Sequence, residues 1–279
     1  ARPARAARAL LQTAAAMGPT FSLGLIQRVA GAEVRAGLSR LCSAEFIHER
    51  AALGEPTYVF KHALTQDVAY GSLLPDDRRR LHQRAAEAIE AIFHDHLDDH
   101  YGVLADHYHR AGATAKAVEY LGRAAEQAVQ RSAYTEAMSQ LRAALTMVAK
   151  LPSGRERNQR ELLLQTALGA AIMATQGMGA PEIESIFSRA GELCREVGET
   201  PELFRVLQGL GVFYAMRLKL DTAEELLERR RRLAEKLTHP AFLPQAQIAH
   251  GHFLLARGDV VGARAELEQG MARYDPRQH

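Results

Sequence analysis

The sequence predicts a mainly α-helical chain, in which a module of three helices and a β-hairpin precedes a solenoid of helical hairpins. Three observations predict this fold class. Helical periodicity runs through nearly the whole chain. Two short runs of β-forming residues, 46–50 and 57–60, interrupt it near the start. Beyond residue 98, a pattern of small and large residues recurs at a spacing of 40.

The first three helices are bounded by residues that start or stop helices. Residues 6–17 have helical periodicity that ends at Gly18-Pro19, and a second helix is expected from Ser22, as its N-cap, to Gly31. A third amphipathic run carries Val34, Leu38 and Leu41.

The two β-type runs flank residues 51–56, whose Gly54 and Pro56 are typical of a hairpin loop. Three helices followed by a two-stranded wing is the order of a winged helix. Two further helices are expected at about 62–74 and 76–93, divided by Pro75, with acidic residues in the first turn of the second. We therefore place a winged-helix-like module with trailing helices at residues 1–94.

Residues 95–279 are expected to form tetratricopeptide-repeat-like (TPR-like) helical hairpins. Residue types match at an offset of 40 in the later part of this region, and an earlier segment matches at half that offset. Small residues at the crossing points let paired helices approach closely, and Tyr108, Tyr120, Phe213 and Phe253 are expected to fill the gaps. The matched positions are Gly211 with Gly251, Phe213 with Phe253, Ala223 with Ala263, Leu227 with Leu267, Ala117 with Ala137, Leu121 with Leu141, and Ala124 with Ala144.

Composition excludes several classes of protein. Of 279 residues, 47% are hydrophobic and 24% charged, and the net charge of +2 does not by itself demand a nucleic-acid or membrane partner. No apolar run is long enough to cross a bilayer, and the first residues lack the apolar core of a signal peptide. Two distant cysteines, Cys42 and Cys194, suit free thiols in a reducing compartment. A cytoplasmic fragment of a longer chain is expected.

Three segments resemble large bacterial signalling proteins that carry a STAND-type AAA ATPase module, then a winged helix, then TPR repeats. The segments are YVFKHALTQDVAYGSLL (residues 58–74), RRRLHQRAAEAIE (78–90) and LADHYHRAG (104–112). Many members begin with an adenylate or guanylate cyclase domain. The resemblance covers about residues 4–150 and is only generically TPR-like beyond. It implies that ATP or ADP and Mg²⁺ bind in an upstream domain, with no cofactor in this chain.

His62 is the one candidate site residue that the resemblance implies. Residues 62–69 are similar to the His-Asp-Leu-x-x-Asp-x-Ala pattern of plant immune receptors of the same superclass, in which the histidine contacts the β-phosphate of ADP. This sequence has Ala63 where those receptors have aspartate. A histidine at a helix N-terminus is well placed for a phosphate. The alternative is that His62 only caps the helix or packs under the wing.

Other groupings favour structural roles. His96 and His100 are four residues apart, as zinc ligands on a helix can be, but Asp98 and Asp99 predict a helix start between them, so a solvated junction is favoured over a metal site. Residues 229–232 are four arginines that follow Glu225 and Glu228, which favours a solvent-exposed face with i,i+4 ion pairs.

The third helix would offer only Arg35, Ser39 and Arg40 to DNA, so nucleic acid is not the favoured partner. There is also no phosphate-binding Gly-x-x-x-x-Gly-Lys loop, no Gly-x-Ser-x-Gly and no paired Cys-x-x-Cys. We therefore expect no enzyme activity in this chain.

The main hypothesis is a regulatory segment of a signalling ATPase that is linked to a nucleotide cyclase. The winged helix closes over the nucleotide of the upstream domain, and the repeats bind a protein partner. Two alternatives stay open: a DNA-binding transcriptional regulator with a TPR effector domain, and a plain TPR scaffold.

Overall fold

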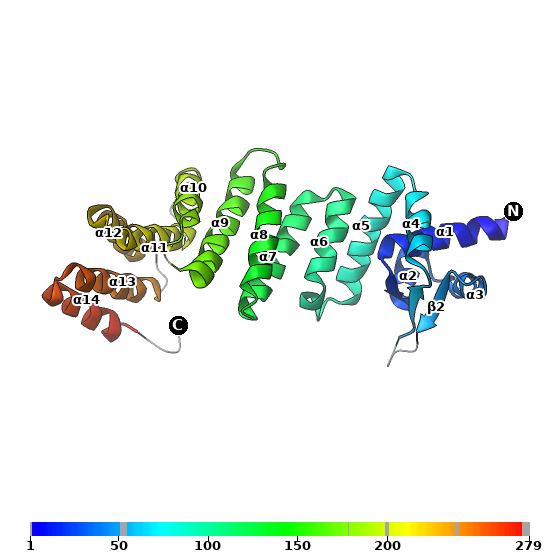
Figure 1. Cartoon of the computed structure of the whole chain (residues 1–279), viewed down its shortest axis with the longest axis horizontal. Coiled ribbons are helices and arrows are strands. Elements are labelled where there is room, and N and C mark those ends of the chain that lie inside the picture. Colours follow the sequence, from blue (N-terminus) through cyan, green and yellow to red (C-terminus); the bar gives the residue numbers. More distant parts are fainter. Residues whose placement is uncertain (1, 51–54, 178, 199–200, 238–239, 275–279) are drawn as a thin grey trace. The chain divides into compact units, whose positions relative to one another are not determined.

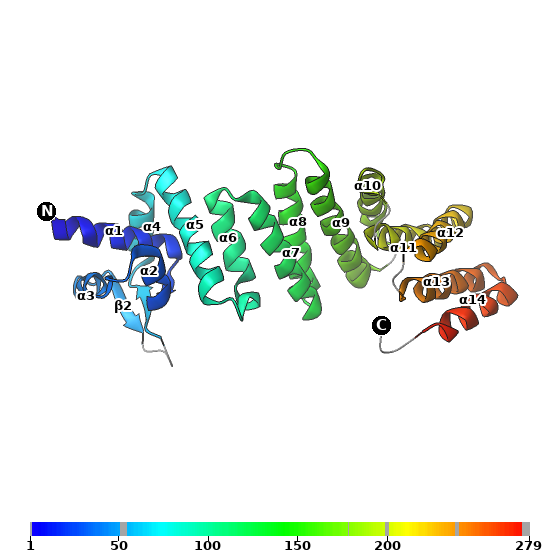
Figure 2. The same cartoon turned by 180° about the vertical axis from the view of Figure 1, so that it is seen from behind.

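The chain is mainly helical and has one small antiparallel sheet (Figures 1 and 2). The computed structural model describes residues 2–50, 55–177, 179–198, 201–237 and 240–274. Its residues form two compact units, 1–124 and 125–279. Within the described residues, no helix combines the length and the apolar character that crossing a membrane requires.

The first three helices begin and end close to the predicted residues. Ser22 caps α2, because its hydroxyl oxygen accepts a hydrogen bond of 3.2 Å from the Leu25 amide. Gly31, at a φ of 111°, ends the same helix in a conformation that favours glycine. The bounds are α1 Arg2–Met17, α2 Leu23–Ala30 and α3 Arg35–Ser43.

The sheet contains both expected strands and a third that the sequence did not indicate. Strands β2 (Ile47–Arg50) and β3 (Thr57–Phe60) are antiparallel, and β1 (Thr20–Ser22) pairs with the other edge of β3. Most of the expected hairpin loop, residues 51–54, lies outside the described residues. The rings of Phe21 and Tyr58 stack at 5.8 Å, and both side chains are buried. Strand β1 was not predicted because, at three residues, it is too short to show the alternation of apolar and polar residues that indicates a strand.

Three helices after the sheet are joined by a buried polar chain. They are α4 (Ala63–Gly71), α5 (Pro75–Ile92) and α6 (Tyr101–Ala111), with a short 3-10 turn at Leu97–His100. The Tyr70 hydroxyl lies 2.9 Å from His82 Nε2, and His82 Nδ1 lies 2.9 Å from His107 Nδ1. The helices therefore pack continuously across residue 94, and the division into 1–94 and 95–279 stays a prediction. In sequence, the division between the two compact units falls within α7 (Thr114–Gln130).

The second unit consists of successive antiparallel helices. Neighbours in sequence pack against each other, and α11 packs against α9 as well as α10 and α12. In both views the hairpins α11–α12 and α13–α14 lie side by side (Figures 1 and 2). The bounds are α8 Tyr134–Val148, α9 Arg155–Gln176, α10 Glu182–Val197, α11 Pro201–Met216, α12 Leu220–Lys236, α13 Phe242–Arg257 and α14 Val260–Ala272.

Among the described residues, one kind of turn joins two successive helices four times. Each time, a left-handed residue ends a helix, and the next amide donates to a carbonyl five residues earlier, at 2.8–3.0 Å. Five positions after the left-handed residue, a buried alanine lies in the next helix. The turn residues are Gly112, Ser132, Leu218 and Gly258, and the alanines are Ala117, Ala137, Ala223 and Ala263.

The predicted 40-residue repeat corresponds to two equivalent hairpins. A Cβ on Gly211 would lie 2.9 Å from Leu227 Cδ2, and one on Gly251 would lie 2.7 Å from Leu267 Cγ. In both hairpins a glycine therefore accommodates the leucine of the partner helix. The aromatic residues expected to fill gaps, Tyr108, Tyr120, Phe213 and Phe253, are all buried.

Candidate functional site

The second unit has a groove that combines apolar walls with an exposed arginine. The groove consists of two adjoining pockets with volumes of about 550 Å³ and 380 Å³. The first pocket is bounded by the end of α7, the start of α8, α9 and α11, and the second by α9, α10 and α11. The α9 side is nearly smooth, because four alanines at helical spacing face the groove: Ala167, Ala170, Ala171 and Ala174.

An aromatic ring forms part of the groove floor. Phe187 of α10 is 1% exposed, and the tip of its ring reaches the backbones of both α9 and α11. A Cβ on Gly169 would lie 2.6 Å from Phe187 Cζ, and a Cβ on Gly209 would also overlap the ring. The ring therefore requires glycine at both positions, and the depth of the groove depends on this packing.

Arg205 of α11 lies where the two pockets meet and lines both. Its side chain is exposed and makes no hydrogen bond or ion pair with any described residue. Glu126 of α7 lines only the larger pocket and is also exposed. The groove therefore presents an unpaired cation at the junction of its pockets and an anion in one of them.

A second arginine is buried behind the groove. Arg230 is 1% exposed, and its guanidinium carbon lies 3.9 Å from the centroid of the Phe204 ring. It donates to Gln208 Oε1 at 2.9 Å and to the Gln245 carbonyl at 3.0 Å, and its Nε has no partner. Burial lowers its pKa to about 9, so the group stays charged at neutral pH.

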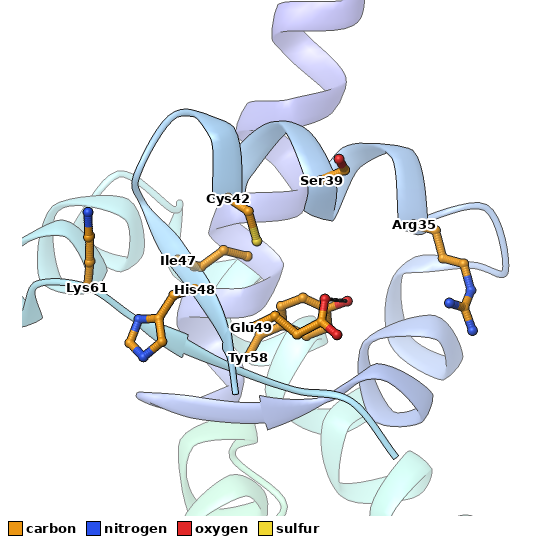
Figure 3. A pocket seen from close by; sticks show the side chains of 8 residues that line it. All are labelled: Arg35, Ser39, Cys42, Ile47, His48, Glu49, Tyr58 and Lys61. Carbon is orange, nitrogen blue, oxygen red and sulfur yellow. Dashed lines mark hydrogen bonds between the residues drawn. The ribbon is translucent and has the colours of Figure 1, made fainter. Parts of the chain in front are cut away.

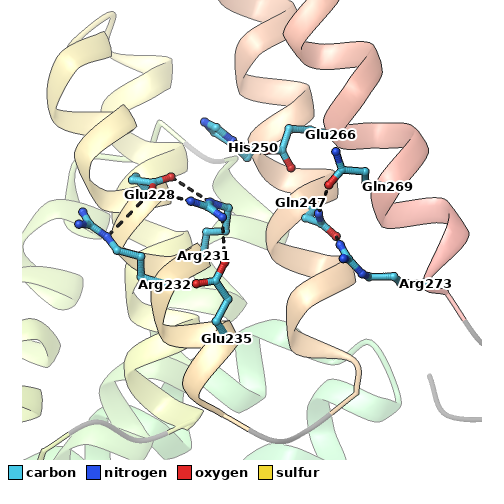
Figure 4. Close-up of polar contacts among 9 residues, drawn as sticks. All are labelled: Glu228, Arg231, Arg232, Glu235, Gln247, His250, Glu266, Gln269 and Arg273. Carbon is cyan, nitrogen blue, oxygen red and sulfur yellow. Dashed lines mark hydrogen bonds and ion pairs between the residues drawn. The ribbon is translucent and has the colours of Figure 1, made fainter.

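Arg230 corrects the prediction that residues 229–232 form a solvent-exposed basic face. One of the four arginines is in the core, because the α12 face that carries it packs on Phe204 and α13. The expected Arg232–Glu228 pair is present at 4.0 Å, but Glu225 and Arg229 make no ion pair among the described residues. Instead, Arg231 bridges Glu228 and Glu235 (Figure 4).

Polar contacts also join α13 to α14. Gln247 is 4% exposed, and its side-chain amide donates to Gln269 at 3.0 Å and accepts from Arg273 at 2.8 Å (Figure 4). His250 lies 3.5 Å from Glu266 in the same region. Gln247, Gln269 and Arg273 satisfy one another, which indicates a structural role in holding the last hairpin, whereas His250 Nδ1 and Glu266 Oε2 are buried without a hydrogen-bond partner among the described residues.

His62, the predicted nucleotide contact, is an exposed N-cap residue of α4. Its side chain makes no capping hydrogen bond. The same helix exposes Leu64 (73%) and Val68 (64%), which line an apolar pocket of about 470 Å³ together with Phe46 and residues of α1. We call the surface of Phe46, Leu64 and Val68 the α4 face. His62 therefore lies at the start of a helix whose exposed side is apolar.

A second pocket of the first unit lies between α3 and the sheet and has a volume of about 420 Å³. It is mixed in charge: Arg35 and Lys61 lie at opposite ends, and Glu49 lies between them beside Tyr58 (Figure 3). Ser39 also lines it, while Arg40 faces a different pocket. The three α3 residues that were weighed for DNA contact therefore do not share one uniformly basic surface.

The histidines around residue 100 are dispersed. His100 lies in the 3-10 turn with its ring 4.0 Å from that of Phe93, and His107 pairs with His82 in the core. Within the described residues, no three His, Cys, Asp or Glu side chains are grouped as metal ligands would be. Cys194 is buried and Cys42 half-buried, and both are free thiols.

The groove residues were missed in the sequence reading. Four alanines follow the i, i+3, i+4, i+7 pattern of one helix face, which indicates a surface of small residues: Ala167, Ala170, Ala171 and Ala174. No comparable pattern identifies Arg205 and Arg230, because the sequence around a single arginine in a helix does not predict whether its side chain is buried or exposed.

No protein-family model matches the chain. A curated protein of Rhizobium meliloti (strain 1021), described as uncharacterized, is 26% identical over 280 residues. That match covers 96% of this chain and 26% of the relative, so the chain spans about a quarter of that protein.

Two solved structures are similar in fold. BtubC (BKLC) from P. vanneervenii has a TM-score of 0.54 and 15% identity, with 90% of this chain and 94% of that one covered. A Signal Transduction ATPase with Numerous Domains (STAND) protein with a tetratricopeptide repeat sensor, from Pyrococcus horikoshii, has a TM-score of 0.47 and 12% identity, over 96% of this chain and 44% of that one. The first likeness supports the helical fold alone.

Proposed function

We propose that this chain is a non-catalytic regulatory segment of a larger signalling protein, and that its repeats bind an extended segment of a protein partner. The observation that carries the proposal is the alanine-lined groove with the unpaired Arg205 at its centre. Small side chains leave room for the main chain of a bound segment, and few polar groups compete with it. Stacked helical hairpins commonly present binding surfaces of this kind.

The groove dimensions favour an extended segment over a compact ligand. The two pockets adjoin along α9 and share Ala170, Ala174 and Arg205, so their lining is continuous. A chain in extended conformation advances by about 3.3 Å per residue and would place successive side chains in the two pockets.

A filled-groove variant tests this proposal. Ala170 is exposed in the groove, whereas Leu163 is exposed on α9 but lines neither pocket. Peptides selected on the wild-type chain from a random dodecapeptide library should lose binding to Ala170→Trp and retain it on Leu163→Trp. Peptides that bind both variants equally would place the interaction elsewhere and contradict the groove proposal.

We propose further that the first unit is a winged-helix-like module that docks on a neighbouring domain of the same polypeptide. The order helix, strand, helix, helix, hairpin agrees with a winged helix. The α4 face suits a protein interface, because exposed apolar side chains that lie together often mark an interaction site. The Rhizobium relative is long enough for further domains. In the STAND-type family that the sequence resembles, the neighbour is an ATPase that binds ADP or ATP with Mg²⁺, and the output domain is often a nucleotide cyclase.

In this proposal His62 contacts the nucleotide phosphate only when the module is docked. Its imidazole is exposed and uses neither nitrogen in a hydrogen bond among the described residues. In the full-length protein, His62→Ala should accelerate ADP release, and Leu64→Asp on the α4 face should do the same by undocking the module. An unchanged ADP release rate in both variants would contradict the docking proposal.

DNA binding is the competing function of the first unit, supported by the exposed Arg35 and Arg40 on α3. A salt-dependent, sequence-selective affinity of the chain for DNA that Arg40→Ala removes would favour it over domain docking.

A further inference from the structure

The smaller pocket of the groove has hydrogen-bond donors without a matching acceptor. Arg205 and Gln208 of α11 line it on one side, and Thr166 of α9 donates its hydroxyl to the Leu162 carbonyl at 2.8 Å. None of its lining residues is acidic, and most are apolar, including Met173, Phe187 and Val212. The exposed Arg205 guanidinium makes no ion pair among the described residues and is available to a charged partner.

The buried Arg230 fixes the orientation of the Gln208 amide. Arg230 Nη2 donates to Gln208 Oε1 at 2.9 Å, so the oxygen of this amide faces the core. The amide nitrogen makes no hydrogen bond among the described residues and is the end left to the pocket. Gln208 therefore presents two N–H donors beside the Arg205 guanidinium.

Arg230 also adds uncompensated positive charge behind the pocket. It is 99% buried, with neutral partners only, and its Nε lacks any acceptor. A buried cation without an anion is costly, and an anion nearby reduces that cost. The free donors in the pocket and the unbalanced charge behind it thus favour the same kind of ligand.

We propose that this pocket binds a carboxylate, namely an Asp or Glu side chain of the extended segment that occupies the groove. The Arg205 guanidinium and the Gln208 amide nitrogen donate to its two oxygens, and the apolar lining accepts the methylenes of the same side chain and a small apolar neighbour. This assignment rests on the proposed function of the groove and specifies the chemistry of its partner.

The test uses the full chain and peptides from the random dodecapeptide library. Peptides whose binding is lost on Ala170→Trp should share an acidic residue flanked by small apolar residues. Replacing that residue by its amide should weaken binding to the wild type by about tenfold or more, because a charge-assisted hydrogen bond is lost. On Arg205→Met the difference in affinity between the acidic peptide and its amide should become much smaller, because the strongest donor to the carboxylate is gone. Arg195→Met, which removes an exposed unpaired arginine of α10 outside the groove, should behave as the wild type.

A second variant separates recognition from fold stability. Gln208→Glu places a carboxylate on Arg230, so the chain should become more stable while affinity for the acidic peptide falls by tenfold or more. Equal or greater affinity in Gln208→Glu would overturn the carboxylate assignment. Groove-dependent peptides without acidic preference would overturn it and leave the groove function intact, whereas failure to select any groove-dependent peptide would overturn both.

Discussion

Gly209→Ala tests whether the Phe187 ring is held between two helices. Alanine is favoured over glycine by about 1 kcal/mol in a helix interior, so the substitution should stabilise the chain if space allows. The structure leaves no space. A Cβ on Gly209 would lie 2.5 Å from Phe187 Cε2 and 2.7 Å from Cε1, about 1 Å inside ordinary carbon–carbon contact.

The ring cannot swing away, because Gly169 on α9 is in equally close contact with its tip and the side chain is 1% exposed. Overpacking of this kind costs about 1–3 kcal/mol, and the rigid ring puts this site at the upper end. After the helix-propensity gain is subtracted, we expect Gly209→Ala to lower the free energy of unfolding by about 2 kcal/mol.

Gly191→Ala on α10 is the matched control, since the nearest atom to its Cβ is Leu210 Cδ1 at 4.0 Å. It should raise the free energy of unfolding by about 0.5–1 kcal/mol. Both variants are compared by urea denaturation and by hydrogen exchange of the α9–α11 amides. In a Phe187→Leu background the penalty of Gly209→Ala should largely disappear. If Gly209→Ala proves as stabilising as Gly191→Ala, the account of the groove floor is wrong.

Three further outcomes follow from the packing. Burial lowers the pKa of His82 to about 4 and also lowers that of His107, so the unfolded state binds more protons than the folded state below pH 6.5. The free energy of unfolding should therefore decrease as the pH is lowered, by about 2 kcal/mol between pH 7 and 5 for His82 alone. A His82→Leu/His107→Leu variant should lose this pH dependence, measured by urea denaturation. Leu218→Gly should raise the thermal midpoint, because Leu218 is 82% exposed at a φ of 58°, whereas Gly258→Ala at the equivalent turn should lower it. Glu90 accepts hydrogen bonds from the Tyr120 hydroxyl at 2.5 Å and from Lys116 at 2.7 Å, so Glu90→Leu should lower the free energy of unfolding of the first unit by about 2 kcal/mol. The control Glu87→Leu, which replaces an exposed glutamate of the same helix, should have only a small effect.

Local signals determined the elements along the chain. Ser22, Gly31 and Pro75 mark helix ends through backbone hydrogen bonding and φ preference, which depend only on near neighbours. The glycine–leucine pairs of the two equivalent hairpins could also be identified from the sequence, because two helices approach closely only where a small residue lies at a fixed offset from its partner. The winged-helix-like order and the helical repeats were predicted from such patterns.

The tertiary structure alone decided which polar groups became buried and which small residues face a groove. Arg230 shares a run of four arginines, yet it alone is inserted against Phe204, because burial depends on the angle at which α12 meets its neighbours. His82 and His107 are 25 positions apart and meet only through the packing of α5 on α6. Arg205 and Gln208 become a candidate carboxylate site for the same reason: a sequence fixes spacing along one helix, and only the packing of several helices fixes what lies across from it.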